Sequence, residues 1–252
     1  MLMGTISPDT IALWLSRDAS NSAFRPLADV TIEILGIRMP SKSLEERAEI
    51  AESMLPRIIS SLERMSTESL EDGVEPTFRL SLDERTSYLK AIESPASSFV
   101  SVLLNKNPRE FEAFCAAVLR SMGGTSAVTG RPGDGGVDFM ARDLSFSADS
   151  GPAPAGARVL VVGQAKLYSR DNLISENELR CFIGGALRRA ADPGDSLTYR
   201  RAHLAPLVYA FWTTSDFHPS AKSYARAMGL WYLNGIGLAQ LAIRVGVSPT
   251  LF

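Results

Sequence analysis

The chain has 252 residues, of which 45% are hydrophobic and 21% are charged, a composition typical of a globular protein. It contains no apolar run long enough to span a bilayer, no secretory signal pattern, and only two cysteines, Cys115 and Cys181, so a membrane partner, a disulfide framework and a cysteine-based zinc site are excluded and a cytoplasmic protein is expected. The net charge of −2 is divided unevenly, with −6 in residues 1–100 and +4 in residues 101–252, which points to polyanion binding by the second part or to a chance distribution.

Residues 1–100 are predicted to form a separate, mostly helical accessory region. Ser7-Pro8 is typical of a helix start, and the alternation of Val30, Ile32 and Ile34 predicts a short strand. No residue pattern here is typical of a catalytic site. The region could be a regulatory or dimerisation module, and its role is not readable.

Two patterns of the capping-box type, in which a serine is followed three residues later by a glutamate, predict further helices in this region. They are Ser43 with Glu46 and Ser81 with Glu84. Pro56 is expected to kink or divide the helix that starts after Ser43.

Residues 101–252 are predicted to form an α/β domain. Asn107-Pro108 starts a helix with apolar residues at helical spacing up to Met122. Strands are predicted at 137–141, 158–166, 206–214 and 230–233, with helices at 175–191 and 219–228 and after Asn234. This order predicts a mixed central sheet flanked by helices on both faces.

Three polar residues on two neighbouring predicted strands form a candidate site. Asp138 follows a glycine-rich turn, and Gln164 and Lys166 are two residues apart, so that their side chains share one face of a strand. A carboxylate and an amide oxygen are ligands that suit Mg²⁺. A lysine beside them can orient a water molecule and balance negative charge on a phosphate.

The first helix of this domain offers a fourth candidate. Glu112 lies at the rim of the apolar stripe, whereas Glu110 points further towards solvent. On helix geometry alone, Glu112 is more often a solvated flank than a site residue.

Taken in order, these motifs resemble the Mrr-like restriction endonucleases of the PD-(D/E)XK nuclease superfamily. The resemblance covers about residues 107–245. It is carried by Phe111-Glu112, by Gly133-Asp-Gly-Gly-Val-Asp138, by Gln164-Ala-Lys166 with Tyr168, by Glu178-Leu179 and Gly184, by the strand that ends in Phe211-Trp-Thr-Thr-Ser215, and by Phe217, Ala221, Ala225 and Gly229 to Gly235.

The resemblance implies a restriction-endonuclease-like fold and a role for each site residue. Asp138 is implied as the central metal ligand, Gln164 as a second ligand where other branches have glutamate, Lys166 as the catalytic lysine, and Glu112 as the acid that completes the metal environment. Asp134, in the turn, is implied as a loop-structuring or outer-shell carboxylate. The implied cofactor is Mg²⁺, with Mn²⁺ as a substitute.

Several basic residues are candidates for contacts with the DNA backbone. They are Arg131, Arg180, Arg188 and Arg189, although any one of them is more often a plain surface charge. Gly184-Gly185 lies within a predicted helix, and close packing against the sheet is the interpretation suggested for it.

The leading hypothesis is a Mg²⁺-dependent DNA endonuclease that hydrolyses a phosphodiester with a metal-activated water, leaves a 5′-phosphate, and acts in restriction or anti-phage defence. A homodimer would supply two active sites for double-strand cleavage. The alternatives are a structure-selective nuclease such as a junction resolvase, a nuclease acting on RNA, and a catalytically silent DNA-binding or scaffold protein.

Overall fold

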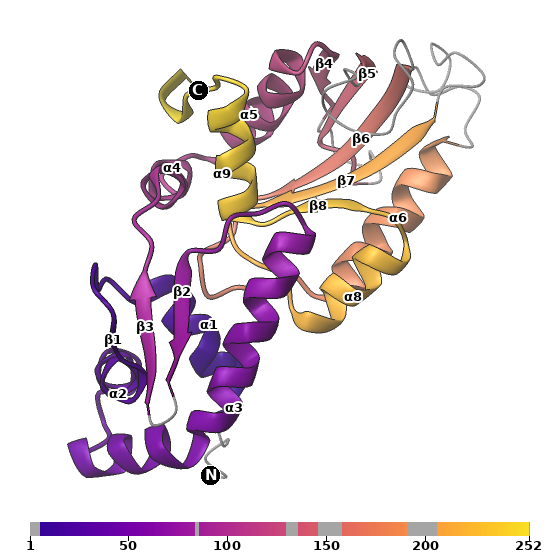
Figure 1. Ribbon diagram of the computed structural model, residues 1–252. Coiled ribbons are helices and arrows are strands. Elements are labelled where there is room, and N and C mark those ends of the chain that lie inside the picture. The colour runs from indigo at the N-terminus through magenta and orange to yellow at the C-terminus, as the bar shows by residue number, and fades with distance from the viewer. Residues whose placement is uncertain (1–5, 84–85, 130–135, 146–157, 191–205, 252) are drawn as a thin grey trace. The chain divides into compact units, whose positions relative to one another are not determined.

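A computed structural model describes residues 6–83, 86–129, 136–145, 158–190 and 206–251 (Figure 1). The chain divides into two compact units, residues 1–94 and 95–252. Within the described residues, no helix is long and apolar enough to cross a membrane.

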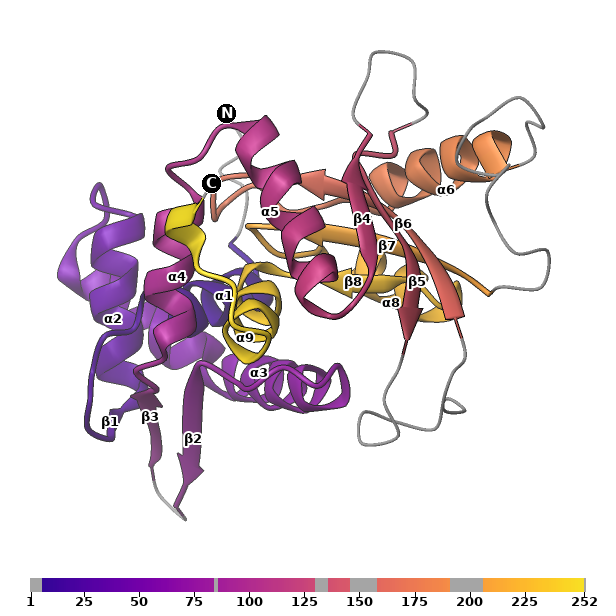
Figure 2. The ribbon, with the colours of Figure 1, turned by 90° about the horizontal axis from the view of Figure 1, so that it is seen from above.

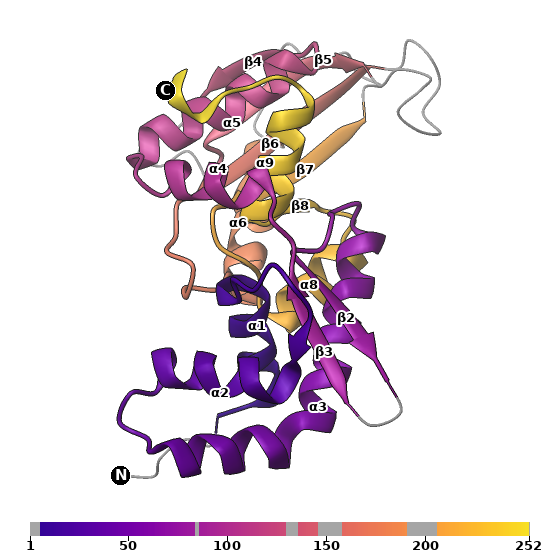
Figure 3. The same cartoon turned by 60° about the vertical axis from the view of Figure 1, so that its left-hand side comes forward.

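The N-terminal unit combines helices with a small antiparallel sheet (Figure 3). Strand β3 lies at the centre of that sheet, between β1 and β2, and the three helices pack together over one apolar core. The elements are α1 (Pro8–Asp18), β1 (Arg25–Pro26), α2 (Leu27–Arg38), α3 (Leu44–Glu71), β2 (Phe78–Leu82) and β3 (Ser87–Ala91).

The strand predicted around Val30 is wrong, because this segment is helix α2. Val30 and Ile34 are buried together with Leu27 and Leu35, and these positions recur at the spacing of one helical face. The alternation of apolar residues that suggested a strand covers only five residues. The longer helical spacing, which buries this face against α1 and α3, decides the conformation.

The two capping-box predictions have opposite outcomes. The Ser43 box is confirmed, since Ser43 and Glu46 exchange backbone–side chain hydrogen bonds of 2.8 and 3.2 Å. Helix α3 runs undivided through Pro56. The prediction at Ser81 is wrong: Ser81 lies in β2 and pairs with Tyr88 of β3. Phe78, Leu80 and Leu82 alternate there, and this strand pattern prevails.

The C-terminal unit confirms the predicted mixed α/β fold. Its five-stranded sheet has the order β4-β5-β6-β7-β8; β4, β5 and β6 are antiparallel, whereas β6, β7 and β8 are parallel. The elements are α4 (Pro95–Leu103), α5 (Pro108–Ser121), β4 (Thr125–Val128), β5 (Phe139–Ser145), β6 (Arg158–Lys166), α6 (Glu176–Ala190), β7 (Leu207–Thr213), α8 (Pro219–Ala227), β8 (Trp231–Leu233) and α9 (Gly235–Arg244).

Helices cover both faces of this sheet (Figures 1 and 2). Helices α4, α5 and α9 enclose one core with Val159 and Val161 of β6. Helices α6 and α8 enclose a second core with Leu160 and Val162. Because side chains alternate along a strand, Gln164 and Lys166 fall on the α6 face.

The end of β7 and the start of α9 approach each other closely at Gly235. The Gly235 amide donates to the carbonyl oxygen of Ser215 at 2.9 Å, and a Cβ on Gly235 would lie 2.4 Å from the carbonyl oxygen of Thr214. Only glycine fits this contact without a shift of the backbone.

We therefore expect Gly235→Ala to destabilise the protein by about 2 kcal/mol or more, in the range of overpacking substitutions. Thermal unfolding of the purified variant measures the effect. Gly184→Ala is the matched control, because a Cβ on this helical glycine meets no atom within 4 Å. An unfolding temperature of Gly235→Ala equal to that of the wild type would contradict the steric argument.

Candidate active site

The Asp138 side chain is fixed to strand β6 at a defined point. Asp138 directly precedes β5, and its backbone amide donates to the carbonyl oxygen of Gly163 at 2.8 Å. Its Oδ2 atom accepts a hydrogen bond from the backbone amide of Ala165, also at 2.8 Å. The carboxylate is thereby held at the backbone of the residue between Gln164 and Lys166, whose own side chains line the cavity on the α6 face.

The side chain of Gln164 lies against the turn that leads into Asp138. Gln164 is only 9% exposed. Gly136 has a φ of +79°, and a Cβ at this position would lie 2.7 Å from Nε2 of Gln164. The left-handed backbone favours glycine here, and a Cβ would in addition displace the end of the Gln164 side chain.

Glu112 approaches the same region from helix α5. The thiol of Cys115, one turn further along α5, has a raised pKa, chiefly because it is buried and further because of the negative charges of Asp138 and Glu112. Both carboxylates therefore lie near one buried residue. Glu110 has a different role: it forms a capping box with Asn107, with hydrogen bonds of 2.9 and 3.0 Å.

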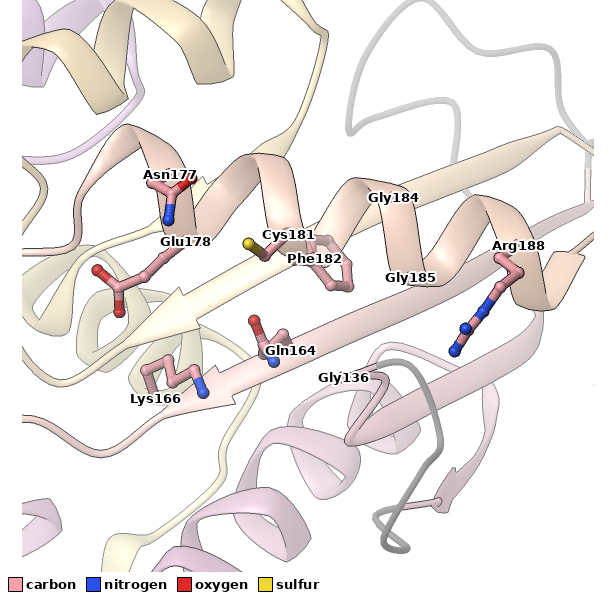
Figure 4. Close-up of a pocket in the computed structure, with 10 residues that line it drawn as sticks. All are labelled: Gly136, Gln164, Lys166, Asn177, Glu178, Cys181, Phe182, Gly184, Gly185 and Arg188. Atoms are coloured by element: carbon pink, nitrogen blue, oxygen red, sulfur yellow. The ribbon is translucent and has the colours of Figure 1, made fainter.

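A cavity of about 510 Å³ lies between β6 and α6 (Figure 4). Its lining includes Gly136 but not Asp138, whose carboxylate is turned to the backbone of β6. Strand β6 and helix α6 contribute side chains that line it from opposite sides: Gln164, Lys166, Asn177, Glu178, Cys181 and Arg188.

Glu178 and Tyr168 join the end of β6 to the start of α6. The Tyr168 hydroxyl donates to Oε1 of Glu178 at 2.9 Å, and Oε2 accepts from the backbone amide and the hydroxyl of Ser175, both at 2.8 Å. Burial, the largest influence, raises the pKa of Glu178, but these hydrogen bonds and the charge of Lys166 together outweigh it and lower the pKa. Sequence reasoning missed this link: Tyr168 counted only as a mark of the resemblance, and Glu178 as such a mark and as the capping partner of Ser175 at the start of the predicted helix.

Thr213 and Thr214 secure the end of β6 from the neighbouring strand. The Thr213 hydroxyl donates to the carbonyl oxygen of Lys166 at 2.8 Å. The Thr214 hydroxyl donates to the carbonyl of Tyr168 and accepts from its amide, at 2.7 and 2.9 Å. Both threonines thus hold the backbone on either side of Leu167 in place.

The remaining predicted site residues have separate positions. Asp134 and Arg131, together with the side chain of Arg189, lie outside the described residues. Arg180 points away from the cavity: its guanidinium donates to Glu176 at 2.6 Å and lies 4.3 Å from the ring centroid of Tyr224. Arg188 is exposed and lines the cavity.

Close packing against the sheet does not explain the glycine at position 184. Gly184 is exposed, and a Cβ there would meet nothing within 4 Å. Glycine in a helix costs about 1 kcal/mol relative to alanine, so the interpretation made from the sequence is wrong for this residue.

The donor set suits a hard cation such as Mg²⁺, which takes few protein ligands and keeps several waters. It comprises the carboxylates of Asp138 and Glu112 and the largely buried amide of Gln164. Among the described residues, no three His, Cys, Asp or Glu side chains gather where they could hold a metal ion.

Comparison with known proteins identifies the family. The family model of the Mrr type, described as restriction endonuclease, matches residues 103–242, more than half of the chain, and confirms the resemblance. No curated protein matches the sequence significantly.

Solved structures of restriction endonucleases are similar in part. The DNA modification-dependent endonuclease AspBHI is 22% identical, with a TM-score of 0.42 over 63% of this chain and 38% of its own. MspJI in complex with a 27-mer oligonucleotide is 16% identical, with a TM-score of 0.39 over 63% of this chain and 36% of its own. FokI bound to DNA is 10% identical, with a TM-score of 0.38 over 95% of this chain and 44% of its own. The chain thus spans less than half the length of these proteins.

The lowered pKa of Glu178 leads to a prediction about stability and pH. A carboxyl group whose pKa is lower in the folded state stabilises the fold above its unfolded-state pKa, and this contribution is lost as the pH falls through the folded-state value. We expect Glu178→Gln to lower the free energy of unfolding at pH 7 by at most about 1 kcal/mol, so that the variant unfolds at a lower temperature than the wild type. The difference in unfolding temperature should shrink below pH 4.5, the ordinary pKa of a glutamate side chain.

Thermal unfolding of both proteins from pH 7 to pH 3 measures the difference in unfolding temperature. Glu176→Gln on the same helix turn is a matched control. A difference between wild type and Glu178→Gln that stays constant over this pH range would contradict the prediction.

Proposed function

We propose, because the chain belongs to the Mrr restriction endonuclease family, that it is a Mg²⁺-dependent endonuclease that hydrolyses phosphodiester bonds in DNA. The observation that carries the proposal is the hydrogen bond from the Ala165 amide to the Asp138 carboxylate. It brings a carboxylate to the residue between an amide and a lysine on the same strand. This combination can bind a divalent cation and a phosphate together.

In this proposal, Asp138, Gln164 and Glu112 hold the divalent cation, with Mn²⁺ as a substitute for Mg²⁺. The cation supplies Lewis-acid activation of water and neutralises charge on the scissile phosphate. The Ala165 amide orients the Asp138 carboxylate by a hydrogen bond. This contact pre-organises one of the three donors.

Lys166 acts on the phosphate. Its ammonium group orients the attacking water and balances the negative charge that develops during in-line attack, a role for which a fixed charge is most effective in a partly desolvated site. Hydrolysis leaves a 5′-phosphate and needs no covalent enzyme intermediate. The bonds from Thr213 and Thr214 to the backbone around Lys166 restrict its main chain.

The wider setting is also proposed. The basic residues Arg131, Arg180, Arg188 and Arg189 contact DNA phosphates, and Asp134 supports the site from the turn. Residues 1–100 form an accessory domain, and residues 101–252 form the nuclease domain. A homodimer supplies two active sites for double-strand cleavage. The protein acts in the cytoplasm as a restriction or antiviral defence effector.

We expect the purified protein to nick or cut plasmid DNA in Mg²⁺ and to be inactive in EDTA. Lys166→Ala should lower the cleavage rate by about 10²–10³-fold, the usual effect of removing one positioned charge, without loss of DNA binding. Gel assays on linear, supercoiled, methylated, branched and RNA substrates measure the rates. Lys90→Ala in the N-terminal unit is the control, and cutting by Lys166→Ala at the wild-type rate would refute the assigned role.

The two glutamates of α5 provide a matched pair. Glu112→Ala should lower the cleavage rate at least tenfold and raise the Mg²⁺ concentration needed for half-maximal rate, because it removes a proposed ligand. Glu110→Ala should retain activity and lose about 1 kcal/mol of stability, because it removes half of a capping box. Cleavage assays with Mg²⁺ titration and thermal unfolding separate the two effects. Equal activities of both variants would contradict the assignment of Glu112.

A further inference from the structure

Helix α6 presents one face of small and polar residues to the cavity beside the proposed site. Asn177, Cys181, Gly184 and Arg188 recur at intervals of three and four residues, and Gly185 lies beside them. Residues at this spacing lie above one another on a helix. Figure 4 shows this face opposite Gln164 and Lys166, with Arg188 at the far end of the helix from Glu178.

The middle of this face carries no side chain, because residue 184 is glycine. Gly184 is exposed in mid-helix, has space around a Cβ and has no left-handed backbone. Neither packing nor conformation requires glycine here, although glycine weakens a helix. A requirement for close approach by a ligand would explain it, because glycine allows another group to come near the helix backbone.

On the β6 side of the cavity, the side-chain amide of Gln164 faces α6. Gln164 is 9% exposed and lines the cavity, and among the described residues no hydrogen bond of its side-chain amide is found. Its amide atoms are not among the fully buried polar atoms that lack a partner in the described residues, so they reach the cavity, where a polar ligand can bind them. The Gln164 amide and the bare helix face therefore point to a polar ligand that fills the space between β6 and α6.

We propose that this cavity is a channel for the substrate strand, in which the sugar–phosphate backbone runs along α6 over Gly184 and one of its phosphates binds Arg188. The inference rests on the proposed nuclease function and adds the path of the strand. Arg188 lies ten residues beyond Glu178, about 15 Å along the helix axis.

The thiol of Cys181 can report whether DNA occupies this channel. Cys181 is exposed on the channel face, whereas Cys115, the second cysteine, is fully buried and has a raised thiol pKa, which makes it unreactive. We expect a 30-base-pair duplex to slow alkylation of Cys181 by N-ethylmaleimide at least tenfold, measured by mass spectrometry on Lys166→Ala protein so that the DNA stays intact. Cys181→Ser protein should not react.

This readout distinguishes the channel from the nuclease function. If the wild type cuts DNA and saturating duplex leaves the alkylation of Cys181 unchanged, the channel is wrong and the nuclease function stands. If duplex protects Cys181 although no cleavage occurs under any metal condition, the channel stands as a nucleic-acid site and the nuclease function fails.

Added bulk at Gly184 tests the path of the strand. Gly184→Ala should unfold at or above the wild-type temperature and bind duplex somewhat more weakly, and Gly184→Leu should weaken duplex binding at least tenfold while remaining folded. Fluorescence anisotropy with labelled duplex measures the affinity. Wild-type affinity in folded Gly184→Leu would overturn the proposal.

Arg188 has a separate signature in the salt dependence of binding. Loss of one phosphate contact lowers the slope of log K against log salt concentration by about 1. Arg188→Ala should show this decrease, whereas Arg244→Ala, an exposed arginine at the end of α9 on the other face of the sheet, should keep the wild-type slope. Equal slopes for both variants would refute the phosphate contact of Arg188.

Discussion

The hydrogen bond between the Ala165 amide and the Asp138 carboxylate is the contact on which the geometry of the site depends. The β5–β6 ladder begins at the pair Phe139 and Gly163, so Asp138 already lies beyond the regular pairing. Beyond this pair a side-chain hydrogen bond continues the link between the two segments, because the Asp138 carboxylate accepts from the backbone amide of Ala165. An aspartate has the right reach for this, whereas a glutamate would carry its charge one methylene further from the strand.

The position of this bond also determines what surrounds the carboxylate. Side chains alternate on β6, so Gln164 and Lys166 project to the α6 face, whereas Ala165, whose amide binds the Asp138 carboxylate, packs against the core on the α5 face. The main chain on both sides of Leu167 is held by Thr213 and Thr214 of the parallel neighbour. The end of β6 is therefore restrained from two strands, one antiparallel and one parallel.

Much of this could be predicted from the sequence, because strong local patterns and the global fold agree there. The apolar run 159–162, which leads into the polar residues Gln164 and Lys166, is typical of a buried strand, and Asn107-Pro108 has the chemistry of a helix start. The failures have a shared cause. Around Val30 and Ser81, a short local pattern was compatible with two conformations, and packing against distant segments, which one sequence does not reveal, selected the other.

The sequence could name the candidate residues of the site, but not most of the other residues that line the cavity. Asp138, Gln164 and Lys166 carry distinctive chemistry at distinctive spacing. The link between Tyr168 and Glu178 has no such signal, because Glu178 also completes an ordinary capping box with Ser175. Nor could the sequence distinguish a glycine required by the backbone, Gly136, from one surrounded by open space, Gly184.

The presence of glutamine at position 164 has a consequence for the order of binding. Of the proposed ligands, only Asp138 and Glu112 bring negative charge to a divalent cation, and the positive charge of Lys166 on β6 opposes them. A cation held by few charges gains most when a substrate phosphate supplies further anionic oxygens. Lys166 is also attracted to that phosphate, so in the proposed site cation and DNA each strengthen the binding of the other.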